Sequence, residues 1–110
     1  MSSVTSALSD VAASLSPDEL TKKVDEIKAA GNERFLKGDY TQAKALYTDA
    51  LSLNPNIVAI YSNRAICELK LEQYGLAIAD ATKAIELDAT FAKAYYRRAC
   101  AHLAILDPKA

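Results

Sequence analysis

The chain has 110 residues, of which 51% are hydrophobic and 25% are charged, and its formal net charge is −1 at pH 7. This composition is typical of one small globular domain and argues against an intrinsically disordered chain. A chain so near neutrality has no overall attraction for nucleic acid or for an anionic membrane. An electrostatic function must therefore depend on how the charges are distributed.

The first 23 residues are predicted to form an extension that leads into the first long helix. Four apolar residues of this extension would share one helical face: Val4, Leu8, Val11 and Leu15. They would suit a short extra helix, but a flexible tail rich in serine and alanine is the interpretation we prefer. The segment Ser-Pro-Asp-Glu at residues 16–19 has the pattern of a capping box with proline in the first turn, so the long helix is expected to begin near Pro17.

The same extension has neither the basic start nor the long apolar stretch of a signal peptide. No apolar run elsewhere approaches the length that spans a bilayer. We therefore expect a protein of the cytoplasm, and also of the nucleus, with no membrane or nucleic-acid partner.

A pattern that begins at Val24 returns at Val58 and again at Ala92, with a period of 34 residues. Small residues recur where two antiparallel helices would need close contact: Gly31, Ala65 and Ala99; Ala43 and Ala77; Ala50 and Ala84. Helical spacing predicts helices over 24–37, 41–53, 58–71, 74–87 and 92–106. Turns are expected at residues 38–39 and 72–73, and Pro55 stops the second helix because proline has no amide hydrogen to donate.

This pattern resembles the tetratricopeptide-repeat family from Val24 to Ala110. The resemblance implies an all-α fold, a right-handed solenoid of helical hairpins with repeats at 24–57 and 58–91 and the first helix of a third repeat within 92–110. A proline common in the family is replaced by Ala89, and the third repeat has no second helix. We therefore expect an exposed apolar face on the last helix, made by Tyr95, Ala99, Leu103 and Leu106.

In this family fold the first helices of successive repeats line a concave face, and the second helices lie outside. Residues 92–106 contain three Lys and Arg residues and no acid, whereas residues 75–88 contain Asp80, Glu86 and Asp88 against Lys83 alone. We therefore expect a cationic groove and a more acidic back.

Five groove positions suggest a site for carboxylates: Lys28, Asn32, Asn63, Lys93 and Arg97. Lys28 and Asn32 are one helical turn apart, as are Lys93 and Arg97. Lysine and arginine can pair with carboxylates, and asparagine can donate to a carboxylate or hold a peptide backbone. Phe35 and Ile66 are expected to supply apolar contact beside this site.

The five residues match the two-carboxylate clamp of co-chaperone tetratricopeptide domains. This resemblance implies binding to the C-terminal Met-Glu-Glu-Val-Asp of heat-shock protein 90, or to the related tail of heat-shock protein 70. The segments at 74–75, 80–82, 84–88 and 93–99 also resemble the serine/threonine protein phosphatase 5 family. That implies a parent co-chaperone phosphatase with two metal ions, whose catalytic domain the repeat domain would cover until a ligand releases it.

Enzyme activity within the 110 residues is not expected. The candidate groups Cys67, Cys100 and His102 have no acid–base partners, and one histidine cannot build a two-metal site. Both cysteines are interpreted as small apolar side chains in a reducing compartment, without a disulfide or a metal. Two alternatives stay open: another co-chaperone adaptor with the same clamp, and a scaffold that self-associates through the exposed last helix.

Overall fold

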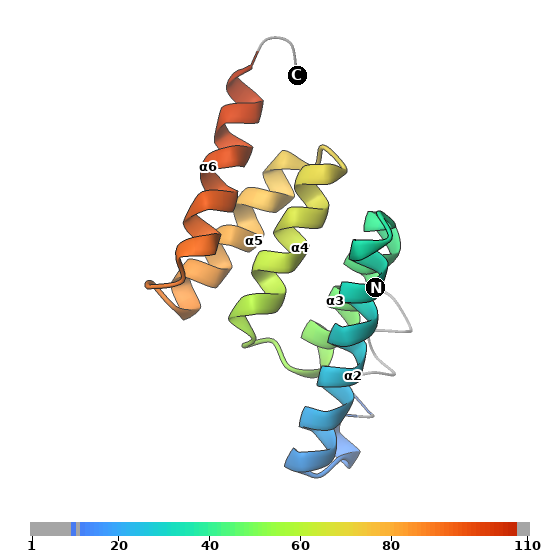
Figure 1. Ribbon diagram of the computed structural model, residues 1–110. Helices are drawn as coiled ribbons and strands as arrows, with labels where there is room; N and C mark the ends of the chain where they lie inside the picture. Colours follow the sequence, from blue (N-terminus) through green and yellow to red (C-terminus); the bar gives the residue numbers. More distant parts are fainter. Residues whose placement is uncertain (1–9, 11, 108–110) are drawn as a thin grey trace. The chain divides into compact units, whose positions relative to one another are not determined.

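The computed structural model describes residue 10 and residues 12–107, and the regular elements that it assigns there are helices without any strand. The long helices are α2 (Pro17–Leu36), α3 (Tyr40–Leu53), α4 (Val58–Lys70), α5 (Tyr74–Leu87) and α6 (Ala92–Leu106) (Figure 1). The all-α prediction is confirmed, and the five predicted helices end within one residue of these bounds. No helix of the described part is long and apolar enough to cross a bilayer.

Helix α2 begins where the sequence predicts it to begin. The Ser16 Oγ accepts a hydrogen bond from the amide of Glu19 at 3.2 Å, and the Glu19 carboxylate accepts one from the amide of Ser16 at 3.0 Å. These two bonds satisfy amide groups that have no partner within the helix, and Pro17 needs none. The bonds from Ser16 also lower the pKa of Glu19, because they stabilise its charged form. The predicted contributions of Val4, Leu8 and Val11 lie outside the described residues.

The chain divides into two compact units, residues 1–56 and 57–110. In the first unit, α2 and α3 form an antiparallel hairpin that packs along its length. Gly31 is buried at their contact, and a Cβ atom there would lie 2.7 Å from Cε1 of Tyr47. Only glycine therefore lets the ring of Tyr47 lie so close to α2. Phe35 and Tyr40 meet edge to face at the closed end of the hairpin, with ring centroids 5.5 Å apart.

The second unit contains α4, α5 and α6, with α5 packed against both neighbours and α6 also contacting α4. Its core is built from the small residues Ala65, Ala77 and Ala101, which have no exposed surface. Alanine at these places lets the helix backbones approach, and larger side chains close the space around them. Those larger side chains are Leu69, Tyr74 and Ile78.

Both hairpin turns contain a residue whose backbone has the left-handed conformation, at the same place in the 34-residue period. Gly38 has a φ of +78° between α2 and α3, and Glu72 has a φ of +59° between α4 and α5. Glycine adopts this conformation without steric cost, whereas a residue with a Cβ does not. The second turn is therefore strained at a position where the first turn is not.

Candidate functional site

Helix α2 carries three of the predicted site residues. Lys28 and Asn32 are one turn apart and both are partly buried, and Phe35 follows one turn later. The side-chain oxygen of Asn32 accepts a hydrogen bond from the Tyr47 hydroxyl on α3 at 2.5 Å. The oxygen end of the Asn32 amide therefore faces α3.

The second unit carries the other predicted residues on two helices in contact. Asn63 and Ile66 lie on α4 and are partly buried, while Lys93 and Arg97 lie one turn apart on α6. Lys93 is exposed and Arg97 is partly buried. Among the residues that the structure describes, neither cation pairs with a carboxylate.

The guanidinium group of Arg97 lies over the ring of Tyr96, with its central carbon 5.4 Å from the ring centroid. Its Nε atom is buried and has no hydrogen-bond partner within the described residues. A buried donor without a partner loses free energy relative to a hydrated one. Arg97 therefore has both a contact with an aromatic ring and a donor that no described residue uses.

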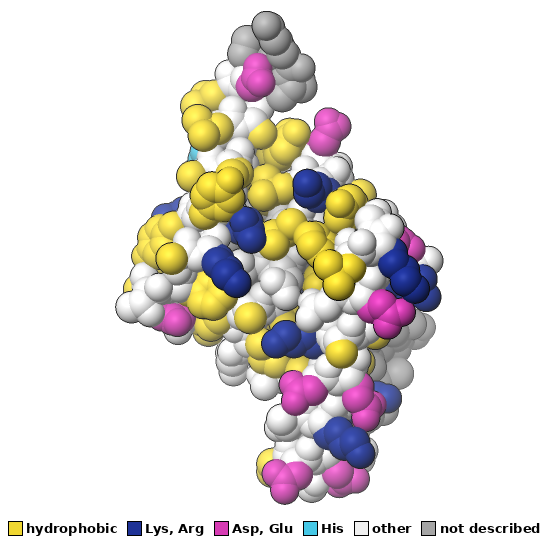
Figure 2. Space-filling view, viewed as in Figure 1, with side chains coloured by type: hydrophobic (Ala, Val, Ile, Leu, Met, Phe, Trp, Pro, Cys, Tyr) yellow, Lys and Arg dark blue, Asp and Glu magenta, His cyan; other side chains and the backbone are white. Residues whose placement is uncertain are grey.

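The neighbouring cation, Arg98, has a different environment. Its guanidinium carbon lies 5.6 Å from the centroid of the Tyr95 ring, and its Nη1 atom is 3.5 Å from the hydroxyl of Thr82 on α5. Arg97 and Arg98 therefore carry equal charge on one helix but contact different groups. Basic side chains lie among hydrophobic ones over α6 in Figure 2.

Counting charged residues helix by helix overestimates the difference in surface charge between the groove helices and the outer helix α5. Asp80 was counted as an acidic group of the outer surface, but it is only 6% exposed and accepts two hydrogen bonds from Arg64. Glu68 on α4 is buried as well, at 2% exposure. These charges act inside the second unit, so the cationic character of α6 rests on Lys93, Arg97 and Arg98 themselves.

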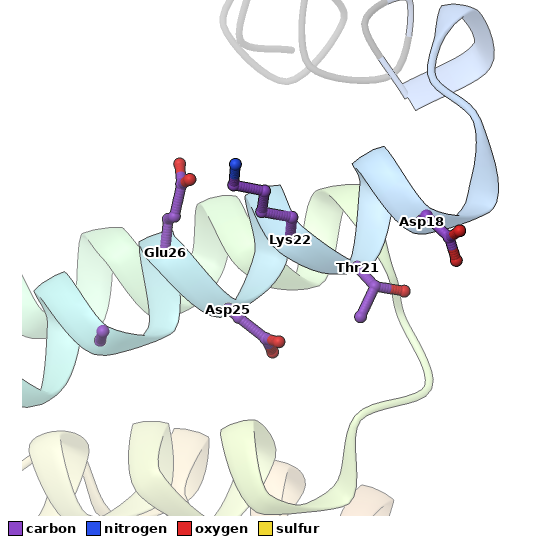
Figure 3. Close-up of a pocket in the computed structure, with 6 residues that line it drawn as sticks. Asp18, Thr21, Lys22, Asp25 and Glu26 are labelled. Atoms are coloured by element: carbon purple, nitrogen blue, oxygen red, sulfur yellow. The ribbon is translucent and has the colours of Figure 1, made fainter.

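A separate open pocket lies along the N-terminal half of α2, and its lining residues are Asp18, Thr21, Lys22, Asp25, Glu26 and Ala29. Figure 3 shows Lys22 and Glu26 projecting from one side of the helix and Thr21 and Asp25 from another. Three carboxylates against one ammonium group make this pocket unsuitable for an acidic peptide. Within the described residues no group of His, Cys, Asp and Glu is arranged to hold a metal ion.

The predicted apolar face of α6 is exposed. Leu103 is 68% exposed and Leu106 is 77% exposed, and Tyr95 and Ala99 are also accessible. Ile105 enlarges the patch, with 54% of its surface accessible. A patch of large apolar side chains of this kind is typical of an interaction surface.

The tetratricopeptide-repeat sequence pattern matches residues 29–57 and 58–91, which together are more than half of the chain. The chain belongs to the tetratricopeptide-repeat family. The matched region is thus a non-catalytic repeat fold, and each matched segment ends at the residue before the next helix begins, α4 at Val58 and α6 at Ala92.

Several known proteins are similar to this chain in sequence or in fold. Human serine/threonine-protein phosphatase 5 is 42% identical over 88 residues, which are 80% of this chain and 18% of the phosphatase. The chain thus spans about a fifth of the length of this relative. The fold is similar to the TPR2AB domain of yeast Sti1 in complex with pHSP90, with a TM-score of 0.78 and 36% identity over 91% of this chain and 36% of that one.

A second solved structure is the first TPR of Spaghetti (RPAP3) bound to the HSP90 peptide SRMEEVD. It has a TM-score of 0.75 and 31% identity, and the match covers 76% of this chain and 67% of that one. The chain is therefore homologous to the repeat region of phosphatase 5 and similar in structure to repeat domains captured with HSP90 peptides.

Two contacts at the candidate site were not anticipated from the sequence. The hydrogen bond from the hydroxyl of Tyr47 to Asn32 was not predicted. The contact between the Arg97 guanidinium and the Tyr96 ring was not predicted either. A hydrogen bond from Tyr47 could have been expected from the sequence, since the hydroxyl of a buried tyrosine normally has a hydrogen-bond partner.

Proposed function

We propose that this chain is a peptide-binding co-chaperone module that holds the acidic C-terminal tail of heat-shock protein 90. In this proposal the two carboxylates at the end of a Met-Glu-Glu-Val-Asp tail bind a clamp of Lys28, Asn32, Asn63, Lys93 and Arg97. The observation that carries the proposal is Arg97: its guanidinium is oriented by Tyr96, and its buried Nε donor is unused within the described residues.

The chemistry of the five residues supports a carboxylate ligand. Arginine presents two parallel donors that match the two oxygens of a carboxylate, and lysine adds a mobile point charge. Such charge-assisted hydrogen bonds contribute about 1.5–3 kcal/mol each. Phe35 and Ile66, both partly buried, would contact an aliphatic side chain of the same peptide.

The wider role follows from the phosphatase relative and is also a proposal. The parent protein would be a serine/threonine phosphatase of the cytoplasm and nucleus, whose catalytic domain, with two metal ions, lies outside these 110 residues. The repeat domain would recruit it to the chaperone and would also contact the catalytic domain as an autoinhibitory cover.

The test is calorimetric titration with a Met-Glu-Glu-Val-Asp peptide as the free acid and as the C-terminal amide. We expect the free acid to bind and the amide to lose at least tenfold in affinity, because amidation removes one charge and one acceptor from the terminal group. Affinity for the acid should fall as salt is raised, since screening weakens exposed charge pairs. A heat-shock protein 70 tail peptide, tested in parallel, distinguishes the two chaperones.

Arg97→Ala and Arg98→Ala form a matched pair for this test. Both remove one positive charge from α6 and one guanidinium from a tyrosine ring. We expect Arg97→Ala to weaken free-acid binding about 10- to 100-fold and Arg98→Ala to change it less than about threefold. Equal losses in both variants would mean that only the overall charge of α6 attracts the peptide.

A second candidate function is self-association through the apolar face of α6. The exposed Leu103 and Leu106 favour it. Light scattering over a range of protein concentrations tests this alternative, and a constant monomer mass would exclude it. Leu103→Lys should abolish any dimer without affecting peptide affinity if the two functions are independent.

A further inference from the structure

We infer that Tyr96 selects the residue that precedes the terminal acid of the bound tail: its exposed ring packs against an aliphatic side chain at that place in the ligand. This inference rests on the proposed function, because it assigns a role within the same candidate site. It adds an apolar ligand contact on α6, whereas the two predicted from the sequence, Phe35 and Ile66, lie on α2 and α4.

Tyr96 is a large aromatic residue that the fold leaves in contact with solvent. It is 64% exposed, although the guanidinium of Arg97 lies over its ring with the central carbon 5.4 Å from the ring centroid. A ring with this exposure adds little to the stability of the fold, because little of its apolar surface leaves water. Most of that surface is therefore accessible to a ligand.

The neighbouring Tyr95 has a role within the fold. Its hydroxyl donates to the carbonyl oxygen of Ala89 at 2.8 Å, which ties α6 to the loop before it, and its ring lies under the guanidinium of Arg98. Tyr95 is also less exposed, at 42%. The two tyrosines are adjacent in sequence but contact different groups, so Tyr95 provides an internal control for Tyr96.

Tyr96 is the large exposed apolar residue nearest to the predicted clamp cations of α6. Lys93 lies one helical turn before it, and Arg97 follows it directly. Leu103 is the next large apolar residue of α6 that is exposed, and it lies six residues beyond Arg97, which is about 9 Å along the helix axis. Two shifts of 34 residues place Tyr96 at the repeat position of Lys28, another predicted clamp residue.

The ring of Tyr96 and the guanidinium of Arg97 form one surface with two chemistries. A carboxylate bound by Arg97 would accept hydrogen bonds at about 2.7–2.9 Å from the guanidinium nitrogens. The preceding residue of an extended peptide lies only about 3.3–3.6 Å further along its chain. That distance is shorter than the 5.4 Å between the guanidinium carbon and the ring centroid. A ligand whose terminal acid is held by Arg97 therefore brings the side chain of its preceding residue within reach of the Tyr96 ring.

The chemistry of the ring decides which side chain suits this place. An aliphatic side chain buries apolar surface of both partners when it packs on an aromatic ring. Glycine has no side chain to bury, and a lysine side chain would be repelled by Lys93 and Arg97. Tyrosine and arginine are also enriched among the residues that dominate binding at protein interfaces. We therefore expect the site to prefer an aliphatic residue, such as valine, directly before the terminal acid.

The experiment is a double-mutant cycle between protein and peptide, measured by calorimetry. The unmodified chain and Tyr96→Ala are each titrated with Met-Glu-Glu-Val-Asp and with Met-Glu-Glu-Ala-Asp, both as free acids. We expect Tyr96→Ala to bind the valine peptide about three- to tenfold more weakly. The change from valine to alanine should cost about threefold or more with the unmodified chain and less than about twofold with Tyr96→Ala, since the ring is then absent. Tyr96→Phe keeps the ring and should bind the valine peptide within about twofold of the unmodified chain.

Tyr95→Ala is the matched control, because it removes the same side chain from the neighbouring position of α6. It should lower the melting temperature, since the bond to Ala89 is lost, and leave the affinity for the valine peptide within about twofold. Tyr96→Ala should show the opposite result, with lower affinity and an unchanged melting temperature. If Tyr95→Ala does not fold, Tyr95→Phe serves as the control, because it removes only the hydroxyl.

Two outcomes overturn the inference while the proposed function stands. In the first, the unmodified chain prefers the free acid to the amide, and Tyr96→Ala binds the valine peptide equally well. In the second, the change from valine to alanine costs the same factor with both chains, so the ring does not contact that side chain. If the unmodified chain shows no preference for the acid, the proposed function itself is wrong, and the inference falls with it.

Discussion

The ion pair between Arg64 and Asp80 should be the largest single polar contribution to the stability of the second unit. Arg64 on α4 donates from Nε and Nη2 to the two carboxylate oxygens of Asp80 on α5, each at 2.7 Å. The side chains are only 20% and 9% exposed, so water screens the pair weakly. The bonds that Arg64 donates to Asp80 are also the main cause of the raised pKa of Arg64.

Asp80→Ala should therefore lower the free energy of unfolding by about 3 kcal/mol. Removing one partner of a buried pair costs about 3–5 kcal/mol, because the remaining charge stays buried without compensation. The lower end applies here, since Arg64 keeps its contact with the Tyr61 ring at 5.6 Å and is partly exposed. Urea unfolding followed by circular dichroism measures the loss.

The chain contains a matched surface pair for comparison. Lys37 and Glu33 on α2 lie 3.2 Å apart, and their side chains are 61% and 68% exposed. Glu33→Ala should cost about 0.5 kcal/mol or less, because solvent screens this pair. The reasoning is refuted if Asp80→Ala costs no more than Glu33→Ala. It is also refuted if the losses from Arg64→Ala and Asp80→Ala simply add in the double variant.

Three further substitutions test other features of the fold. Glu72→Gly should raise the free energy of unfolding by up to about 1 kcal/mol, measured by urea, because it relieves a left-handed residue at φ +59°; a loss of stability would contradict this. Glu19→Gln should flatten the pH dependence of the melting temperature as the pH falls through and below the ordinary carboxyl pKa of 4.5. The pKa of Glu19 is below its ordinary 4.5 in the folded chain, so its contribution is present above that value and is lost as the pH falls through the lowered one; an unchanged pH profile would count against the capping box. Cys67→Ala should cost about 1 kcal/mol in thermal unfolding because the thiol is fully buried, yet leave peptide affinity unchanged; a folded variant that no longer binds would show that Cys67 is more than a core residue.

The helices were predictable because the capping box and the helical spacing of apolar residues agree with the 34-residue period. The predicted ranges 74–87 and 92–106 are those of α5 and α6, and the capping box placed the start of α2. Small residues at equivalent positions predicted close helix contacts, and Ala65 and Ala77 do form the core of the second unit. Such features depend on residues near in sequence or on the 34-residue period, so one sequence is enough to find them.

The polar contacts between helices were not predictable in the same way. Helical periodicity places a residue on a face but does not tell which polar groups meet across the hairpin. Asp80 was therefore counted as a surface charge, although it is buried against Arg64. The five-residue clamp also combines positions from both compact units, and it stays a prediction until the binding experiment is made.

The cross-hairpin contacts share a regularity that sequence reasoning can use. Asn32 and Tyr47 are 15 residues apart, Arg64 and Asp80 are 16 apart, and Thr82 and Arg98 are again 16 apart. This spacing results from two antiparallel helices joined by a short turn, so polar residues 15 or 16 apart in such a hairpin are candidates for a direct bond. In the first hairpin this spacing joins α2 to α3 through Asn32 and Tyr47, and in the second it joins α4 to α5 through Arg64 and Asp80. The same backbone geometry thus carries a hydroxyl–amide bond in one repeat and an ion pair in the next, and the side chains at the two positions decide which contact forms.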